Sequence, residues 1–128
     1  NEIAPEKKTP TYLQVVVPHT FQPGSAALSP EMAEYLDVAG TVLASYPSYH
    51  CALRQVTAES GDWQTDSRLA FRRASAVRQA LAKTTALPAA RMTALGYADW
   101  SNLPQLATEE NRVRRQVLVF DLYKPDAR

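Results

Sequence analysis

Two adjacent arginines, Arg72 and Arg73, lie near the start of an otherwise apolar segment that reads LAFRRASAVRQAL. A guanidinium group presents its N–H donors in a planar fork that matches a carboxylate, so either arginine has the chemistry to bind an anion. A pair of surface arginines that only keeps the protein soluble is the alternative. If the segment forms a helix, the side of that helix on which each arginine lies decides between these two interpretations.

Few other residues offer site chemistry. Cys51 is the single cysteine, which excludes an intramolecular disulfide and a cysteine-based zinc site, and we expect it to be a packing residue. His19 and His50 show no metal-ligand spacing, so we expect no metal. The adjacent Glu109 and Glu110 point in different directions on a loop or helix, which is typical of a solvated surface.

Motifs for nucleotide or acyl chemistry are not found. The sequence has only four glycines, no glycine-rich phosphate loop and no G-x-S-x-G motif. We therefore expect no catalytic residues and no cofactor, and the protein is predicted not to be an enzyme.

The composition fits one globular domain. The chain has 128 residues and a net charge of +1, which gives no field for holding nucleic acid. No apolar run reaches the roughly 20 residues of a membrane span. We predict a flexible arm over 1–10, a folded domain over 11–124 and a short tail over 125–128. The sequence begins with neither Met nor a signal peptide, so we expect any membrane tether to lie in an upstream segment that this sequence does not include.

The first half of the domain predicts a strand, a helix and a second strand. The β-branched run TYLQVVV predicts a strand that ends at Pro18. Ser29 is a suitable N-cap for a helix that starts at Pro30 and stops before Pro47. The second strand is expected over YHCALRQVT, from Tyr49. The helix repeats apolar residues at helical spacing, namely Met32, Tyr35, Leu36, Ala39, Val42 and Leu43.

The second half predicts a helix and two strands. Asp66 is the expected N-cap of a helix that ends near Thr84, with Arg73 on or beside its buried stripe and Arg72 turned toward water. RMTALGY predicts a short strand, and DWSNLPQLATEEN a loop with at most a helical turn. The final strand RRQVLVFDLY is apolar on both faces, which favours a central position in the sheet.

The predicted order is β-α-β-α-β-β, an α+β fold in which helices pack on one face of a mixed sheet as a two-layer α/β sandwich. Strands joined through a helix favour at least one parallel pair. Trp63 and Trp100 fall at strand ends, where each is either an exposed anchor for a partner or a lid over a small core.

Four segments in this order, PHTFQPGSAALSPE, LAFRRASAV, RMTALGYADWSNLP and NRVRRQVLVF, resemble the OmpA-like peptidoglycan-binding domain, in particular the form found in MotB-type flagellar stator proteins. The similarity runs from about Tyr12 to Leu122. It implies a non-catalytic periplasmic domain, tethered to the inner or outer membrane, that holds the diaminopimelate of the peptidoglycan stem peptide. It also implies partners within an envelope complex and allows a homodimer.

The resemblance also assigns the ligand-binding positions. Arg73 corresponds to the arginine that binds the ligand carboxylate, and Asp66 to the asparagine that opens the second helix. Thr57 corresponds to a threonine that is followed by an aspartate, and this aspartate meets the ligand ammonium. In this chain the aspartate position is Ala58, so the acid is missing.

This departure predicts weakened or altered ligand binding, because losing one partner of a desolvated charge pair commonly costs about 2–5 kcal/mol. Glu59 or Asp62 in the same loop is a candidate replacement for the carboxylate. In a purely structural alternative, Arg73 pairs with Asp62, Asp66 or Glu59 and fixes the loop to the helix. The chain also inserts residues between Asn111 and the Arg114–Arg115 pair, where the family's final turn is expected to be remodelled.

Three functions remain open from the sequence. The first is a cell-wall anchor with weakened or altered ligand choice. The second is the same fold used as a protein-interaction module of a secretion apparatus or a stator-like complex. The third is an unrelated small α/β enzyme with a site around His50.

Overall fold

The computed structural model describes residues 13–84 and 88–124, so the predicted arm over 1–10 and tail over 125–128 lie outside the described residues. Its element order confirms the β-α-β-α-β-β prediction and adds one short helix before the last strand. In chain order the elements are β1 (Leu13–Val16), α2 (Pro30–Ala44), β2 (His50–Thr57), α3 (Trp63–Thr84), β3 (Met92–Tyr97), α4 (Glu109–Arg114) and β4 (Gln116–Tyr123), with 3-10 turns at Ala89–Arg91 and Pro104–Leu106.

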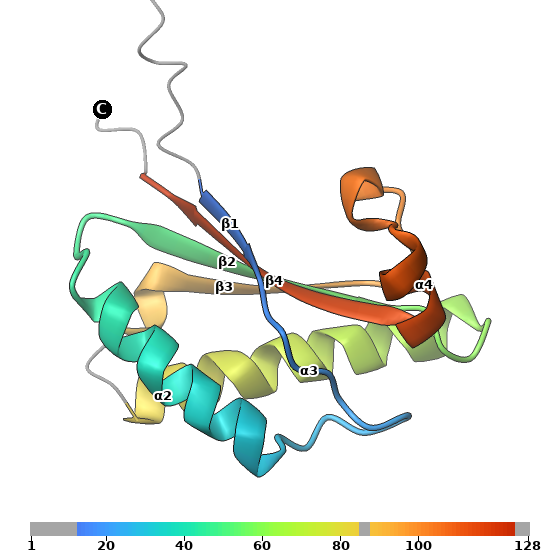
Figure 1. Ribbon diagram of the computed structural model, residues 1–128, viewed down its shortest axis with the longest axis horizontal. Helices are drawn as coiled ribbons and strands as arrows, with labels where there is room; N and C mark the ends of the chain where they lie inside the picture. The colour runs from blue at the N-terminus through green and yellow to red at the C-terminus, as the bar shows by residue number, and fades with distance from the viewer. Residues whose placement is uncertain (1–12, 85–87, 125–128) are drawn as a thin grey trace, which may run out of the picture.

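The four strands form one mixed sheet in the order β1-β4-β2-β3 (Figure 1). β4 runs antiparallel to both of its neighbours, with Phe120 opposite Val15 on one side and Leu53 on the other. β2 and β3 are parallel. The predicted central position of the last strand and the predicted parallel pair are therefore both confirmed.

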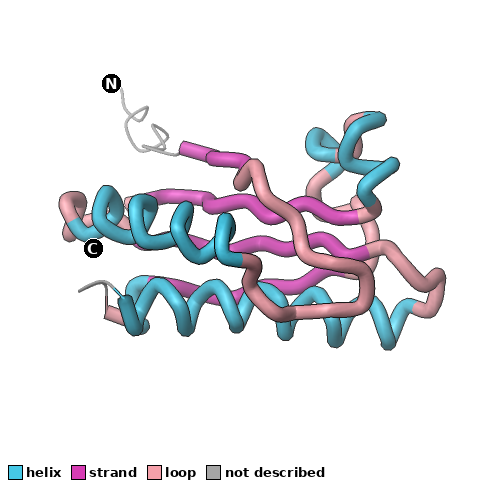
Figure 2. The backbone as a smooth tube through the Cα atoms, turned by 60° about the horizontal axis from the view of Figure 1, so that its bottom comes forward, coloured by secondary structure: helices cyan, strands magenta, loops and turns pink. Residues whose placement is uncertain are grey.

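The two long helices, α2 and α3, lie on the same face of the sheet (Figures 1 and 2). α2 begins as predicted, because the Ser29 hydroxyl accepts a hydrogen bond from the Met32 amide at 3.0 Å and Pro30 opens the first turn. Met32, Leu36 and Leu43 are buried against the sheet and α3. Val42 is the exception to the predicted stripe, since its side chain is half exposed.

α3 begins earlier than predicted, and Asp66 is not its N-cap. The helix starts at Trp63, and Asp62 just before it accepts hydrogen bonds from the backbone N–H and the hydroxyl of Thr65, as an N-cap residue does. Asp66 lies inside the first turn and is buried. The helix ends at Thr84, as expected.

The main core lies between the sheet and these two helices. The backbone of α3 packs closely on β3 at Gly96, where an added Cβ would clash with the backbone of Ala70 and Phe71. The buried members of the main core are Val17, Phe21, Met32, Leu36, Leu43, Cys51, Leu53, Val77, Leu81, Met92, Leu118 and Phe120.

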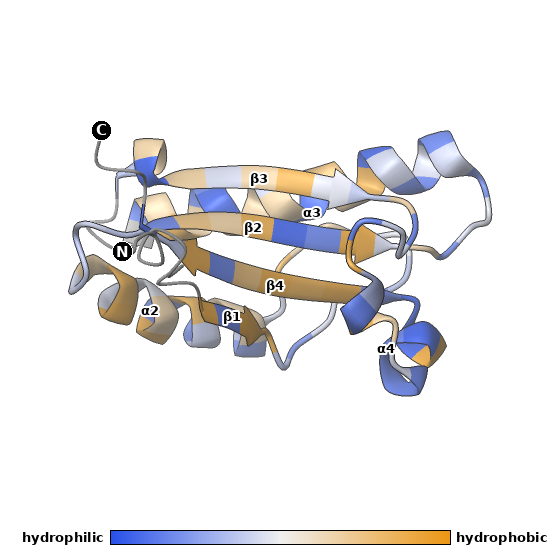
Figure 3. Ribbon diagram, turned by 90° about the horizontal axis from the view of Figure 1, so that it is seen from above, coloured by the Kyte–Doolittle hydropathy of each residue, from blue (hydrophilic) through white to orange (hydrophobic). Residues whose placement is uncertain are grey.

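A second, smaller core lies on the opposite face of the sheet, where residues 98–115 fold over one end of the strands (Figure 3). α4 belongs to this segment and was predicted only as a loop with at most a helical turn. The Thr108 hydroxyl accepts from the Asn111 amide at its N-terminus. Of the two alternatives left open for the tryptophans, the contacts of Trp100 with this core fit a lid, whereas Trp63 is 66% exposed.

Candidate functional site

Arg73 projects from α3 into the end of the sheet and is completely buried. Its Nε donates to the Ser25 carbonyl at 2.8 Å, and Nη2 donates to the Gln22 carbonyl at 3.0 Å. Its Nη1 donates to the Thr57 hydroxyl at 3.0 Å and to Glu59 Oε2 at 2.6 Å. We call this set of contacts the arginine clamp. It joins α3 to the end of β2 and to the loop that precedes α2.

Both oxygens of the Glu59 carboxylate are engaged. Oε2 meets Arg73 and also accepts from the Gln116 amide at 3.3 Å, while Oε1 accepts from the Gly24 backbone N–H at 2.9 Å. The side chain of Glu59 is 14% exposed. The negative charge is therefore largely withdrawn from water and is compensated by the guanidinium and two further donors.

The loop residue Phe21 supports the clamp from the side. The Arg73 guanidinium carbon lies 5.1 Å from the centre of the Phe21 ring, within the range of a cation–π contact. Gln116 at the start of β4 fixes the Phe21 backbone twice, accepting from its N–H at 2.9 Å and donating to its carbonyl at 2.8 Å. Four segments that are distant in the sequence thus meet around one cation.

The structure separates the two arginines as the helical spacing predicts. Arg73 is buried and Arg72 is exposed. Of the three acids named as structural partners for Arg73, Glu59 makes the ion pair.

The other two acids of the loop organise the loop itself. Asp66 accepts hydrogen bonds from the backbone N–H groups of Ser60 and Gly61 and from the Ser60 hydroxyl. Asp62 is fully exposed, and its hydrogen bonds from the Thr65 side chain and backbone hold the pKa of its carboxyl below the usual value. The structure therefore places Thr57 and Glu59 against Arg73. Asp62 and Asp66 instead accept hydrogen bonds from the site loop and the start of α3.

Ala58 lies at the junction between β2 and the site loop and is partly buried. Its N–H donates to the Arg115 carbonyl at 2.9 Å, and Arg115 adopts a left-handed conformation with φ of 61° at the end of α4. Residues 112–114 thus complete α4, and the C-cap residue Arg115 holds the backbone of Ala58 at the end of β2.

This arrangement limits what the site can bind. A carboxylate ligand that uses the Arg73 fork has to displace Glu59, a carboxylate already held by three donors. The methyl group of Ala58 accepts no hydrogen bond from an ammonium group. Sequence reasoning did not single out Gln116, although an amide that opens an otherwise apolar strand is a signal for such a role.

Within the described residues, no helix is long and apolar enough to cross a membrane. In the same ranges, no group of three or more His, Cys, Asp or Glu side chains is placed to hold a metal ion.

Comparisons with known proteins agree on the fold. The periplasmic domain of Helicobacter pylori MotB matches with a TM-score of 0.70 and 18% identity, over 93% of this chain and 86% of that one. The peptidoglycan-associated lipoprotein of Burkholderia pseudomallei matches with a TM-score of 0.63 and 24% identity, over 84% of this chain and 88% of that one. A putative MotB-like protein of Desulfovibrio vulgaris has a TM-score of 0.67 and 20% identity, over 90% of this chain and 75% of that one.

At these identities the structural matches establish the fold alone. None of the curated protein sequences matches this chain. A family model does: the one described as the OmpA family matches residues 20–116, a range that contains the whole arginine clamp. Since this match covers most of the sequence and agrees with the fold, the chain belongs to the OmpA family.

Proposed function

We propose that this chain is a non-catalytic periplasmic domain of a cell-envelope complex, whose inherited association with the peptidoglycan stem peptide is weakened. Two proteins with the same fold support this location and ligand, one a periplasmic domain of MotB and the other a peptidoglycan-associated lipoprotein. One observation carries the weakening: the Arg73 guanidinium is fully buried and already paired with Glu59.

The expected loss has two physical sources. Without an acid at position 58, the ligand ammonium lacks its partner, which costs about 2–5 kcal/mol, or roughly thirty-fold to several thousand-fold in affinity. In addition, the ligand carboxylate competes with Glu59 for Arg73. An internal group competes at a high effective concentration because it is tethered beside its partner.

A second candidate function is a protein-interaction module without cell-wall binding. It is favoured by the exposed indole of Trp63, which is 66% exposed at the start of α3, directly after the site loop. Aromatic side chains of this kind are enriched among the residues that anchor protein interfaces.

A sacculus pull-down distinguishes the two functions. We expect weak retention of the unmodified chain, stronger retention of Ala58→Asp, and the strongest retention of Ala58→Asp combined with Glu59→Gln. Asp37→Asn changes an exposed acid of α2 outside the site and is the control, so its retention should equal that of the unmodified chain. Circular dichroism confirms that each variant is folded. If no folded variant binds sacculi, cell-wall association is refuted and the interaction module remains.

A further inference from the structure

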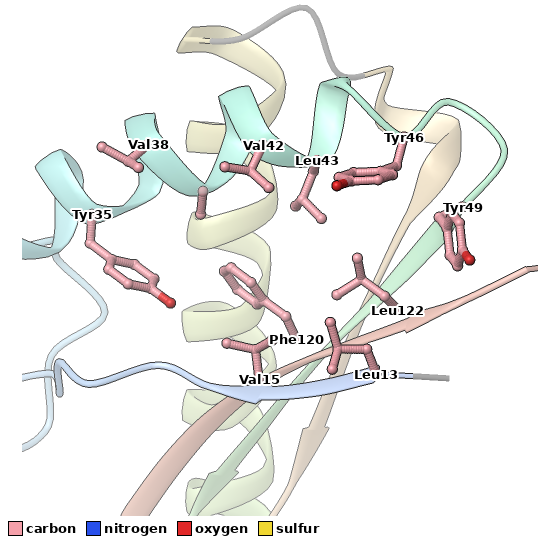
Figure 4. Close-up of a pocket in the computed structure, with 11 residues that line it drawn as sticks. Leu13, Val15, Tyr35, Val38, Val42, Leu43, Tyr46, Tyr49, Phe120 and Leu122 are labelled. Atoms are coloured by element: carbon pink, nitrogen blue, oxygen red, sulfur yellow. The ribbon is translucent and has the colours of Figure 1, made fainter. Parts of the chain in front are cut away.

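An apolar groove of about 600 Å³ lies apart from the arginine clamp, between α2 and the β1 edge of the sheet (Figure 4). Its floor contains Phe120 and Leu43, which are almost fully buried. On its rim, Leu13, Val38 and Val42 are 57%, 63% and 52% exposed, respectively. Contiguous exposed apolar surface of this kind marks interaction sites in soluble proteins, so the groove is a candidate docking surface.

The residues of α2 that line the groove repeat at helical intervals. Tyr35, Val38 and Val42 are separated by three and four residues, and Tyr46 follows four residues later, just beyond the end of the helix. From Tyr35 to Val42 this row runs for about 10 Å along the helix axis, or two turns. An amphipathic helix docks in a groove through apolar anchors at the same intervals, so the row fits one apolar face of a partner helix.

The lining of the groove is uncharged, but the α2 side of its rim is acidic. Glu31 lies one turn before Tyr35, and Glu34 lies one turn before Val38. Asp37 is the neighbour of Val38, and all three acids are exposed. Since α2 contains no lysine or arginine, no cation on this helix compensates the three carboxylates.

The other elements around the groove leave the acidic rim along α2 in place. The β1 wall, Leu13–Val16, is uncharged, and the ring of His19 lies 5.6 Å from that of Tyr35. The described cations lie at the opposite end. Arg91 donates to backbone carbonyls in the turn between α2 and β2, and Lys124 directly follows β4. An occupant therefore meets negative charge over the N-terminal half of α2.

These charges favour one kind of occupant. A second copy of α2 that crosses at the centre of the groove would bring two Asp37 carboxylates together. A helix with lysine or arginine beside its apolar row instead places cations against Glu31 and Glu34. We propose that the groove docks a basic amphipathic helix of a partner protein, with its cations over the N-terminal half of α2. The proposal assigns a partner class to the interaction module and does not depend on the arginine clamp, so it can fail independently of the sacculus pull-down.

Fluorescence anisotropy of the full chain with labelled model helices of about 18 residues, or five turns, tests the proposal. The basic peptide carries leucine at helical spacing and lysine elsewhere, and the acidic peptide has glutamate in place of lysine. A scrambled peptide has the basic composition without an apolar face. We expect the basic peptide to bind at least about tenfold more tightly than the other two, because only this peptide matches both the apolar row and the acidic rim.

Two paired substitutions separate the apolar contribution from the electrostatic one. Val38→Ser combined with Val42→Ser should weaken binding of the basic peptide at least about tenfold, because less apolar surface is then buried. Glu31→Lys combined with Glu34→Lys should reverse the preference in favour of the acidic peptide, because the rim then repels lysine.

Two residues of α4 provide matched controls. Val113 and Glu109 are exposed and lie outside the groove. Val113→Ser and Glu109→Lys should therefore bind the basic peptide as the unmodified chain does. Thermal melting verifies that every variant is folded.

Several results overturn the proposal. The first is no binding of the basic peptide up to about 1 mM. The others are equal binding of all three peptides and equal effects of the groove and control substitutions. A sedimentation series that shows a dimer disrupted by the paired valine substitutions assigns the groove to a second copy instead. Peptide binding that appears only after residues 1–10 are deleted assigns the groove to the chain's own N-terminal segment.

Discussion

Replacing Arg73 by Met should destabilise the protein strongly. The substitution retains much of the aliphatic volume but removes the charge and the four hydrogen bonds of the guanidinium. It also leaves the Glu59 carboxylate, 14% exposed, without its cationic partner. Breaking a buried ion pair from one side typically costs about 3–5 kcal/mol, because the remaining charge stays desolvated.

The neighbouring residue provides the control. Arg72→Met is the same chemical change one position earlier on α3, but Arg72 is exposed, so we expect a change within about 0.5 kcal/mol. For a domain of this size, about 4 °C of melting temperature corresponds to 1 kcal/mol. The Arg73 variant should therefore melt about 12–20 °C lower than the Arg72 variant.

A double-mutant cycle isolates the ion pair from the other contacts. Glu59→Gln retains an oxygen for the Gly24 amide but removes the negative charge that faces Arg73. In urea unfolding, the combined variant should lose about 1–2 kcal/mol less free energy of unfolding than the losses of the two single variants added together. The reason is that the second substitution no longer leaves a buried charge without its partner. Equal losses for Arg72→Met and Arg73→Met, or additive losses in the cycle, would show that the guanidinium is not a buried structural cation.

Three further predictions concern the core and the site loop. Gly96→Ala should cost about 1–3 kcal/mol in urea unfolding, because the new methyl group meets the α3 backbone at Phe71 rather than a movable side chain. Burial raises the pKa of the Cys51 thiol to about 12. Because the same thiol ionises at a lower pH in the unfolded chain, the free energy of unfolding should decrease as pH rises from about 9 toward 12. This decrease should be smaller in Cys51→Ala. Asp66→Ala should lower the melting temperature by several degrees, because it strands the loop amides that the buried carboxylate accepts, whereas the exposed Asp37→Ala should not.

The sequence predicts this fold well wherever the determinants are local. Ser29 and Pro30 set the start of α2 through a cap and a fixed backbone angle, and both act within one turn. The apolar run of β4 required cover on both faces, which only a central strand receives. Helical spacing alone also separated buried Arg73 from exposed Arg72.

The partners of Arg73 were harder to predict, because they depend on how distant segments meet. Three acids lie within seven residues of one another, and spacing does not reveal which one faces the cation. That choice is made by Gly24 and Gln116, which approach from other parts of the chain and hold Glu59 in place. The half-exposed Val42 of α2 has a similar cause, since periodicity shows how wide the apolar face of a helix is but not how much of that face the sheet covers.

The arginine clamp also has a kinetic consequence. Its carbonyl partners, Ser25 and Gln22, lie 48 and 51 positions away from Arg73 along the chain. Contacts over such separations require the sheet and both long helices to be assembled first, so we expect the clamp to close after the rate-limiting step. Its strength should then determine how long a folded molecule survives, while the speed at which new molecules fold changes little.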